Sequence, residues 1–285
     1  PPPPLPPLPP VGPVATLVGA GDIASCSVNG DEATAKLLDG VIAADPAATV
    51  FTVGDNAYDN GTPSEFTNCY GPTWGRHRDR TRPATGNHEY GTTNASGHFG
   101  YFGTRAGEPA KGYYSYDVGA WHVVVLNSNC SKVGGCGAGS PQEKWLRADL
   151  AASAASCTVA YWHHPRFNSG SYGNDSSVAA FWKALHEFGA EVVLNGHSHL
   201  YERFAPQRPD GTADPAFGIR QFIVGMGGRS NYPFGTVQAN SEVRNSDTNG
   251  VMKLTLRPDG YDFAFLPVAG RSFTDTGSGT CHGRP

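Results

Sequence analysis

Short polar motifs follow several apolar segments of this 285-residue sequence, and their side chains are of the types that bind metal ions. Each motif combines aspartate, asparagine or histidine with a turn-forming glycine or proline. Carboxylate, carboxamide and imidazole together make the mixed oxygen and nitrogen donor set of transition-metal sites. In chain order the motifs are Gly21-Asp22, Gly54-Asp55-Asn56-Ala57-Tyr58, Gly86-Asn87-His88-Glu89, His163-His164-Pro165 and Asn195-Gly196-His197-Ser198-His199.

These donors are too many for one tetrahedral zinc ion, and they suit two metal ions roughly 3.5–4 Å apart that share a carboxylate. Each motif alone is a weak signal, because Gly-Asp pairs are common in turns and a histidine pair is more often structural. The Gly-Asn-His and Gly-His-Ser-His segments could likewise be ordinary turns. All five motifs in one chain are hard to reach by chance, and we therefore predict a binuclear site.

The elements that must position the motifs are buried strands separated by helices. Apolar runs predict strands over 14–20, 49–53, 157–162, 191–194 and 219–224, and a weaker one over 82–85. Helical spacing predicts helices over 31–44 and 176–188, and a capping box at Ser140 predicts a third helix to about Ala154. Hairpins are expected over 113–127 and 251–266. The alternation predicts an α/β fold with added antiparallel strands.

Five of these strands end at a polar motif. Ligands of open α/β sheets bind at the carboxyl ends of the strands, where a glycine allows the chain to turn sharply. Residues 56–112 are polar and glycine-rich with little strand or helix signal, which indicates a long functional loop. Residues 1–12 are proline-rich and read as a linker, and residues 13–285 as one catalytic domain.

Composition narrows the class of protein. The net charge is −4, whereas a protein that binds nucleic acid through its phosphates is normally basic. No apolar run approaches the roughly 18 residues of a membrane helix. Hydrophobic residues make up 39% of the chain, too many for a disordered protein. We expect no nucleic-acid scaffold and no membrane span. The oligomeric state stays open, with a monomer favoured.

Six cysteines permit three disulfides in fifteen possible pairings, and they show no metal-finger spacing. Cys130 and Cys136 flank a short glycine-rich loop and are predicted to pair. Cys26 and Cys69 both lie just beyond ligand-bearing strand ends and are expected to pair, which leaves Cys157 with Cys281. The alternative is free thiols in a cytosolic protein. With the proline-rich start, the cysteines suggest a secreted protein whose signal peptide has been removed.

The motifs resemble the purple acid phosphatase branch of the calcineurin-like metallophosphoesterases. The resemblance covers roughly residues 14–270. Its most specific parts are Tyr58 in Gly-Asp-x-x-Tyr and the segment Gly-His-x-His-x-Tyr-Glu-Arg over 196–203. It implies a four-layer α/β/β/α sandwich of two mixed sheets flanked by helices. The fibronectin-like domain of large plant members has no counterpart here.

The resemblance also implies a ligand set and a reaction. Fe(III) and a divalent ion (Zn, Mn or Fe) would hydrolyse a small phosphate monoester by attack of a metal-bound hydroxide. Asp55 would bridge the metals, and His88 would contact the substrate together with Asn87, so Asp55 and His88 are the catalytic candidates. Asp22, Tyr58 and His199 would bind the ferric ion, and Asn87, His163 and His197 the divalent ion.

Other residues keep open roles. Large plant members carry further histidines after the His-x-Pro motif, but residues 166–177 contain none. Arg166, Tyr172 and Asp175 could replace them or could be solvated loop residues. His164 is interpreted as a packing residue beside a ligand, and Glu202 and Arg203 as structural.

Two other functions compete with an acid phosphatase. The same ligands would serve a phosphodiesterase or a neutral or alkaline phosphatase. The chain could also be a non-catalytic protein with a vestigial site, although all seven ligand positions hold competent residues. No Gly-x-Ser-x-Gly or P-loop motif supports covalent serine or nucleotide-loop chemistry.

Overall fold

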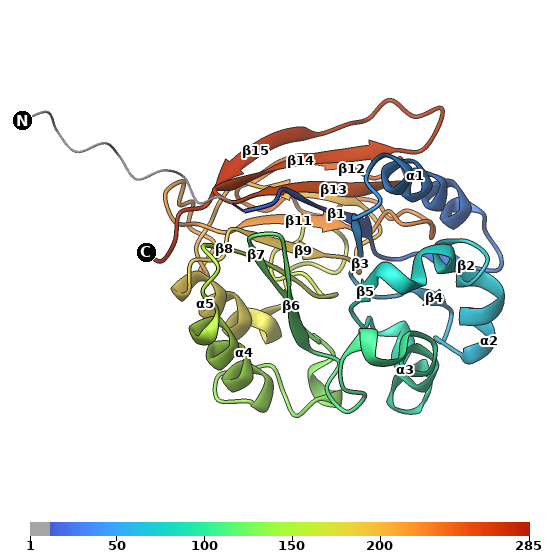
Figure 1. Cartoon of the computed structure of the whole chain (residues 1–285), viewed down its shortest axis with the longest axis horizontal. Helices are drawn as coiled ribbons and strands as arrows, with labels where there is room; N and C mark the ends of the chain where they lie inside the picture. Colours follow the sequence, from blue (N-terminus) through green and yellow to red (C-terminus); the bar gives the residue numbers. More distant parts are fainter. Residues whose placement is uncertain (1–11) are drawn as a thin grey trace, which may run out of the picture.

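Two mixed β-sheets face each other in the computed structural model, which describes residues 12–285 (Figure 1). The predicted linker lies outside the described residues except for Gly12. The first sheet has the order β15 (Thr276–Thr280), β14 (Gly260–Pro267), β13 (Gly250–Arg257), β1 (Ala15–Ala20), β3 (Thr49–Thr52) and β5 (Thr81–Pro83). The second has the order β12 (Ser241–Asn245), β10 (Tyr201–Phe204), β11 (Arg220–Val224), β9 (Val192–Asn195), β8 (Cys157–Tyr161), β7 (Trp121–Val125) and β6 (Tyr114–Val118).

Parallel strands form one half of the first sheet, up to its edge at β5, and the centre of the second sheet, and antiparallel strands complete both sheets. β1, β3 and β5 run parallel, as do β7, β8, β9 and β11. The expected hairpins are present as β6–β7 and β13–β14. A small two-stranded ladder, β2 (Ala24–Ser25) with β4 (Ala57–Tyr58), joins the loops that follow β1 and β3.

Alternating side chains of β1 show how the layers stack. Leu17 belongs to the hydrophobic cluster that contains Val124 of the second sheet and Trp182 of α5 (Ala179–Glu187). Val18 points the other way, into a cluster with Leu38 of α1 (Gly30–Ala44). α5 lies beside α4 (Pro141–Ala152) against the second sheet, at the lower left of Figure 1. The expected four-layer α/β/β/α sandwich is therefore confirmed.

The segment over residues 56–112, predicted as a long loop with little strand or helix signal, is more structured than expected. It contains α2 (Pro63–Glu65), α3 (Ser96–Phe102), a π-helical turn over Phe66–Tyr70 and several 3₁₀ turns. Buried aromatic side chains, Phe66 and Phe102 among them, hold these turns together. Each turn is too short to produce a hydrophobic period, so sequence patterning could not detect it.

The start of α4 corrects a second prediction. Ser140 Oγ accepts a hydrogen bond from the backbone N–H of Glu143, as a helix cap should. The carboxylate of Glu143 does not return the bond to Ser140, because it accepts the N–H of Gly139 and pairs with Arg147. Only half of the capping box forms, and the helix ends at Ala152.

All six cysteines form disulfides: Cys26–Cys69, Cys130–Cys136 and Cys157–Cys281. These are the pairs that the sequence led us to expect. The first ties the loop after β2 to the helical segment beside the polar motifs. The last fastens the C-terminal tail to the start of β8.

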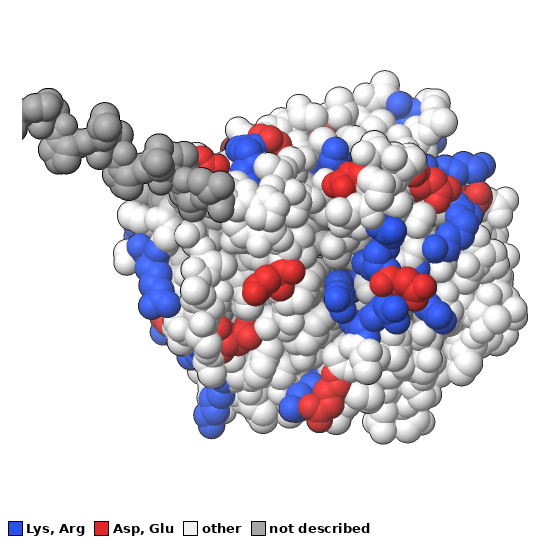
Figure 2. Space-filling model, in the orientation of Figure 1, with Lys and Arg blue, Asp and Glu red and all other residues white. Residues whose placement is uncertain are grey.

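Charged residues make up only 16% of the chain. Figure 2 shows a largely uncharged face on which acidic and basic groups lie in mixed clusters. Within residues 12–285, no helix combines the length and apolar character needed to cross a membrane.

Candidate metal centre

Loops from both sheets bring the five polar motifs to one place. Asp22 follows β1 and Asp55 follows β3 in the first sheet, while His163 follows β8 and His197 follows β9 in the second. Asp22, Asp55 and His197 have φ angles of 58°, 51° and 67°. Such left-handed backbone is costly for residues with a Cβ, and it gathers at functional sites where the surrounding structure enforces it.

The two aspartates are held in the same way. Asp22 Oδ2 accepts the backbone N–H of His197 at 2.9 Å, and Asp55 Oδ1 accepts the backbone N–H of His88 at 2.9 Å. Each carboxylate thus has one oxygen fixed by the chain and a second oxygen that points into the cluster. Both side chains are buried.

Asp55 Oδ2 lies between two groups of donor atoms. On one side is the Tyr58 hydroxyl at 3.1 Å, and that hydroxyl is also 3.0 Å from Asp22 Oδ1 and 3.1 Å from His199 Nε2. On the other side is His163 Nε2 at 3.2 Å, which lies 3.1 Å from Asn87 Oδ1. Tyr58, Asp22 and His199 therefore form one set of contacts and His163 with Asn87 a second, and Asp55 Oδ2 contacts both sets.

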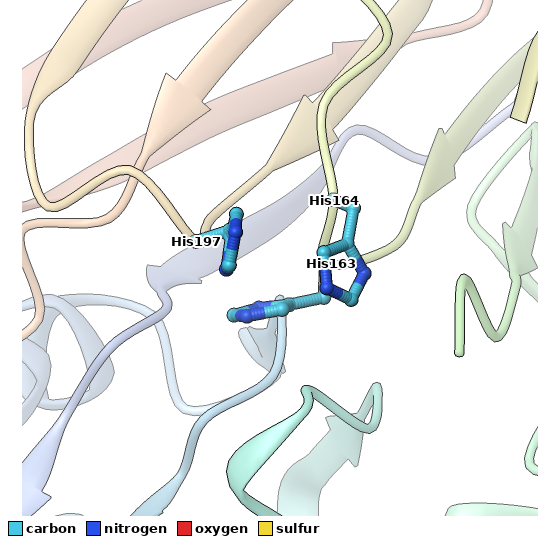
Figure 3. Close-up of side chains that lie close together, drawn as sticks. All are labelled: His163, His164 and His197. Atoms are coloured by element: carbon cyan, nitrogen blue, oxygen red, sulfur yellow. The ribbon is translucent and has the colours of Figure 1, made fainter. Parts of the chain in front are cut away.

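The imidazoles are oriented by backbone carbonyl groups. Nδ1 of His163 donates to the carbonyl of Val53 at 2.9 Å, and Nδ1 of His199 donates to that of Ser230 at 2.5 Å. Both Nε2 atoms therefore face the cluster, an arrangement typical of histidine ligands. The ring of His197 makes no hydrogen bond to the described residues, and its centroid lies 5.0 Å from that of the His163 ring (Figure 3).

The pKa shifts of three clustered side chains reflect both the histidine partners of the buried aspartates and the negative charge of these aspartates. Burial would raise the pKa of Asp55, but the charges and hydrogen bonds of His163 and His88 hold it well below its ordinary value. Burial opposes a charge on His163, yet Asp55 raises its pKa to about 9. Burial and the charges of Asp22 and Asp55 raise the pKa of Tyr58 well above its ordinary range. Cations bound here would replace the protons that now offset this charge.

The donor chemistry fits a pair of metal ions. Phenol and carboxylate oxygens are hard ligands suited to a ferric ion, and imidazoles with an amide oxygen suit a softer divalent ion. The ring nitrogens of His197 are free to serve as ligands. Two sets of three residues have potential ligand atoms that all lie within 4.8 Å of one another: Asp22, Asp55 and His163; and His163, His164 and His197.

The remaining predicted residues fall around this cluster. His88 Nε2 is 3.8 Å from Asp55 Oδ2, and its Nδ1 donates to the carbonyl of Asp59 at 2.5 Å. Tyr172 is 56% exposed and stacks on the ring of His197, with ring centroids 4.3 Å apart. Asp175 lines a cavity of about 280 Å³ beside His164 and His197. Burial lowers the pKa of Arg166, whose side chain lies over Phe167.

Glu202 and Arg203 have structural contacts. The buried carboxylate of Glu202 accepts the backbone N–H of Ser169, in the loop that follows β8. Arg203 forms ion pairs with Asp275 and Glu242. Because the two residues are neighbours on β10, their side chains point to opposite faces and do not pair with each other.

Three residues contact the cluster although the sequence predicted no role for them. Glu89 is fully buried, and its carboxylate accepts backbone N–H groups from the loops after β3 and β5. Tyr232 stacks on the ring of His199 at 4.0 Å, and the guanidinium of Arg229 lies 4.9 Å from the centre of the Tyr58 ring. Glu89 was visible within Gly-Asn-His-Glu, whereas Arg229 and Tyr232 lie in a loop without any motif.

Comparison with known proteins identifies the family. The family model of calcineurin-like phosphoesterases matches residues 16–201, a stretch that includes all seven predicted ligands. The chain belongs to the calcineurin-like phosphoesterase family. It is 27% identical over 191 residues to purple acid phosphatase 15 of Arabidopsis thaliana, an alignment that covers 54% of this chain and 35% of that protein. The resemblance to the purple acid phosphatases is thereby confirmed, although the chain spans only about a third of this relative.

Solved structures show the same fold. A purple acid phosphatase from yellow lupin superposes with a TM-score of 0.76 at 18% identity, covering 95% of this chain and 55% of that chain. GAP50, described as the anchor in the inner membrane complex of Plasmodium, superposes with a TM-score of 0.72 at 12% identity, covering 95% of this chain and 90% of that chain. Proteins with different descriptions therefore share this architecture, and function must be argued from the site.

Proposed function

We propose that this calcineurin-like phosphoesterase is a binuclear metal enzyme that hydrolyses phosphate monoesters at acidic pH, as a purple acid phosphatase does. The observation that supports this most is the position of Asp55 Oδ2, within 3.2 Å of both Tyr58 and His163. Asp22, Tyr58, Asp55 and His199 would hold Fe(III), and Asp55, Asn87, His163 and His197 a divalent ion such as Zn, Mn or Fe.

The substrate requires positive charge that the chain as a whole does not supply. A phosphate monoester is a dianion, and the protein carries a net charge of −4. Two bound metal ions would supply local positive charge and lower the pKa of a coordinated water. The amide nitrogen of Asn87 can donate to a phosphoryl oxygen because its Oδ1 faces His163.

His88 is the residue that we propose to contact the substrate. Its Nδ1 is fixed by the carbonyl of Asp59, so Nε2 faces the cluster beside Asp55. A hydrogen bond from Nε2 to a phosphoryl or leaving-group oxygen is worth about 10²–10⁴ in rate where it transfers a proton. If His88 transfers the proton, His88→Ala should harm alkyl phosphates far more than nitrophenyl phosphate, whose leaving group needs little protonation.

An activity test separates the competing functions. Purified protein is supplied with iron and one divalent metal at a time and assayed from pH 4 to 9 on a nitrophenyl monoester and a bis-nitrophenyl diester. Preference for the monoester with an acidic optimum supports the proposal, and preference for the diester or an alkaline optimum supports the second function. Absence of turnover on both would favour a non-catalytic role.

Matched variants tie the activity to the cluster. Asp55→Asn preserves the size of the side chain and should abolish turnover. Asp262→Asn makes the same change at a carboxylate that pairs with Arg257 on the surface of the first sheet, and it should leave turnover unchanged. Equal activity of the two variants would refute the assignment of Asp55.

The proposal includes an extracellular setting and one catalytic domain. Three disulfides support secretion because such bridges persist in oxidising compartments. Residues near both ends of the predicted domain, Leu17 and Phe265, lie in the same hydrophobic cluster, which supports a single unit over 13–285.

A further inference from the structure

His164 lies beside the proposed divalent site, and the hydroxyl group of Ser128 contacts its ring. Ser128 follows β7 and is 4% exposed. Its Oγ accepts the backbone N–H of His164 at 3.0 Å and lies 2.7 Å from His164 Nδ1. One serine side chain therefore contacts both the backbone and the ring of His164.

The hydrogen bonds of Ser128 favour a proton on Nε2 of His164. The backbone N–H can only donate, so Ser128 Oγ is the acceptor in that bond. Among residues 12–285, its hydroxyl proton has no acceptor other than His164 Nδ1, and donation to that nitrogen satisfies it. A neutral imidazole that accepts at Nδ1 carries its proton on Nε2.

The surroundings of His164 suit a ligand with oxygen atoms. Its ring lies 4.5 Å from the ring of His197 and 4.9 Å from that of His163, and Figure 3 shows the three imidazoles gathered from two loops. The cavity of about 280 Å³ at this place is lined also by Tyr172 and Asn174. A phosphoryl group that occupies the neighbouring site would bring its oxygen atoms to this wall.

We propose that His164 contacts the substrate, donating a hydrogen bond from Nε2–H to a phosphoryl oxygen, and that Ser128 is the positioning residue that sets this tautomer. The proposal rests on the proposed phosphoesterase function. A nitrogen that carries a proton cannot ligate a metal, so the assignment differs from a role as a further metal ligand.

Three measurements test the proposal on the metal-loaded protein: metal content, the Kd for inorganic phosphate by calorimetry, and kcat and KM. His164→Ala should weaken phosphate binding about tenfold, the effect of losing one hydrogen bond worth about 1.4 kcal/mol. Metal content should stay at the wild-type value. His164→Gln keeps an N–H donor and should recover part of the affinity, which a role in packing alone would not predict.

A fourth measurement tests the positioning role of Ser128 and needs no activity assay. Nitrogen-15 NMR of histidine-labelled protein should show His164 protonated at Nε2 in the wild type and a mixture of tautomers in Ser128→Ala. Ser115→Ala is the matched control, because that hydroxyl donates to Asp149 far from the cluster. Near-wild-type circular dichroism of each variant shows that it is folded.

The outcomes separate the alternatives. Loss of a metal ion in His164→Ala would show that His164 is a metal ligand. Unchanged phosphate affinity with both metals intact would show that it is a packing residue. Either result overturns the proposal, and so does a wild type in which Nδ1 of His164 carries the proton. If the wild type binds phosphate but hydrolyses no ester, the proposed function fails while the contact of His164 with phosphate is still decided by the Kd values.

Discussion

The carboxylate of Glu89 accepts the backbone N–H of Asp55 at 2.9 Å. The same carboxylate accepts the N–H groups of Asn56 at 2.7 Å and Gly86 at 2.6 Å. One buried side chain therefore fixes the loops after β3 and β5, which carry the proposed bridging ligand and Asn87. The carboxylate of Glu89 acts here only as a hydrogen-bond acceptor, because all three partners are backbone N–H donors.

Replacing Glu89 with glutamine should loosen this junction. The carboxamide has one acceptor oxygen, and its NH₂ group would face a backbone donor. Leaving a buried donor without a partner costs about 1–3 kcal/mol, so the free energy of unfolding should fall by that amount. Urea unfolding followed by circular dichroism measures the change. Glu108→Gln, at an exposed residue that pairs with Lys111, is the control and should be neutral. Equal stability of the two variants would contradict the role of Glu89.

Gly86 approaches Asp55 so closely that no side chain fits. A Cβ at Gly86 would lie 2.1 Å from Asp55 Oδ1 and 2.4 Å from its backbone nitrogen. Gly86→Ala should therefore displace Asp55 and abolish both turnover and stable metal binding.

Gly100 provides the matched control for this substitution. It lies in α3, and a Cβ there would meet nothing within 4 Å. Gly100→Ala should keep full activity and gain about 0.4–1 kcal/mol of stability from the reduced freedom of the unfolded chain. Metal content measured on both variants checks the pair; retention of metal and activity in Gly86→Ala would show that Asp55 tolerates displacement.

The strand ends were predictable because buried strands and glycine-rich motifs leave strong local patterns. β1, β3, β8 and β9 lie within a residue or two of their predicted bounds. The residue types of the motifs predicted that they meet in one binuclear site. That the motifs of β8 and β9 meet those of β1 and β3 across two different sheets is a tertiary relationship, which only the resemblance to a known family anticipated. The strand β12 was missed, since its sequence Ser-Glu-Val-Arg-Asn is polar and only partly buried.

Contacts made by loops without motifs could not be predicted. Arg229 reaches Tyr58 and Asp59 from a loop at least 170 residues away in sequence, so no spacing rule links them. Ser128 is an ordinary residue in the sequence, and its relation to His164 depends on the parallel pairing of β7 with β8. Local patterns specify elements, whereas such pairs are specified by the packing of elements on one another.

Metal stoichiometry should distinguish a shared ligand from a terminal one. The wild type is expected to bind two metal ions per chain. Asp55→Asn should disturb both because Asp55 Oδ2 contacts donors of both groups, while Asn87→Ala should weaken mainly the one beside His163. Elemental analysis after dialysis measures the counts. A fully active wild type with a single metal ion would refute the binuclear assignment.

Tyr58 should give the iron-loaded protein its colour. Its hydroxyl lies within 3.1 Å of Asp22, Asp55 and His199, the three other residues proposed for the ferric site. Coordination of phenolate to Fe(III) produces a charge-transfer band in the visible range. Tyr58→Phe removes only the oxygen and should abolish the band while iron remains bound. His88→Phe alters an aromatic neighbour of Tyr58 that is outside the ligand set, and it should keep the band. Identical spectra for wild type and Tyr58→Phe would exclude Tyr58 as a ligand.

Glu191 should make stability depend on pH at a place remote from the metal centre. Burial raises its pKa from the ordinary 4.5 to about 8, although hydrogen bonds from the backbone N–H groups of Thr158 and His282 act in the opposite direction. Between these pH values the folded protein retains a proton that the unfolded chain has released. The free energy of unfolding must therefore fall as pH rises from about 4.5 to about 8, and this contribution must be level outside that interval.

Glu191→Gln should remove this contribution to the slope. Its amide oxygen can still accept the hydrogen bond from Thr158, so the variant should unfold like the wild type near pH 4.5 and be more stable than the wild type near pH 8. Urea unfolding of metal-free protein at both pH values, with Glu108→Gln as the exposed control, measures the difference. Because the metal ligands titrate equally in both proteins, their contribution cancels in the comparison. A stability difference between wild type and Glu191→Gln that stays constant from pH 4.5 to 8 would show that Glu191 titrates normally in the folded protein.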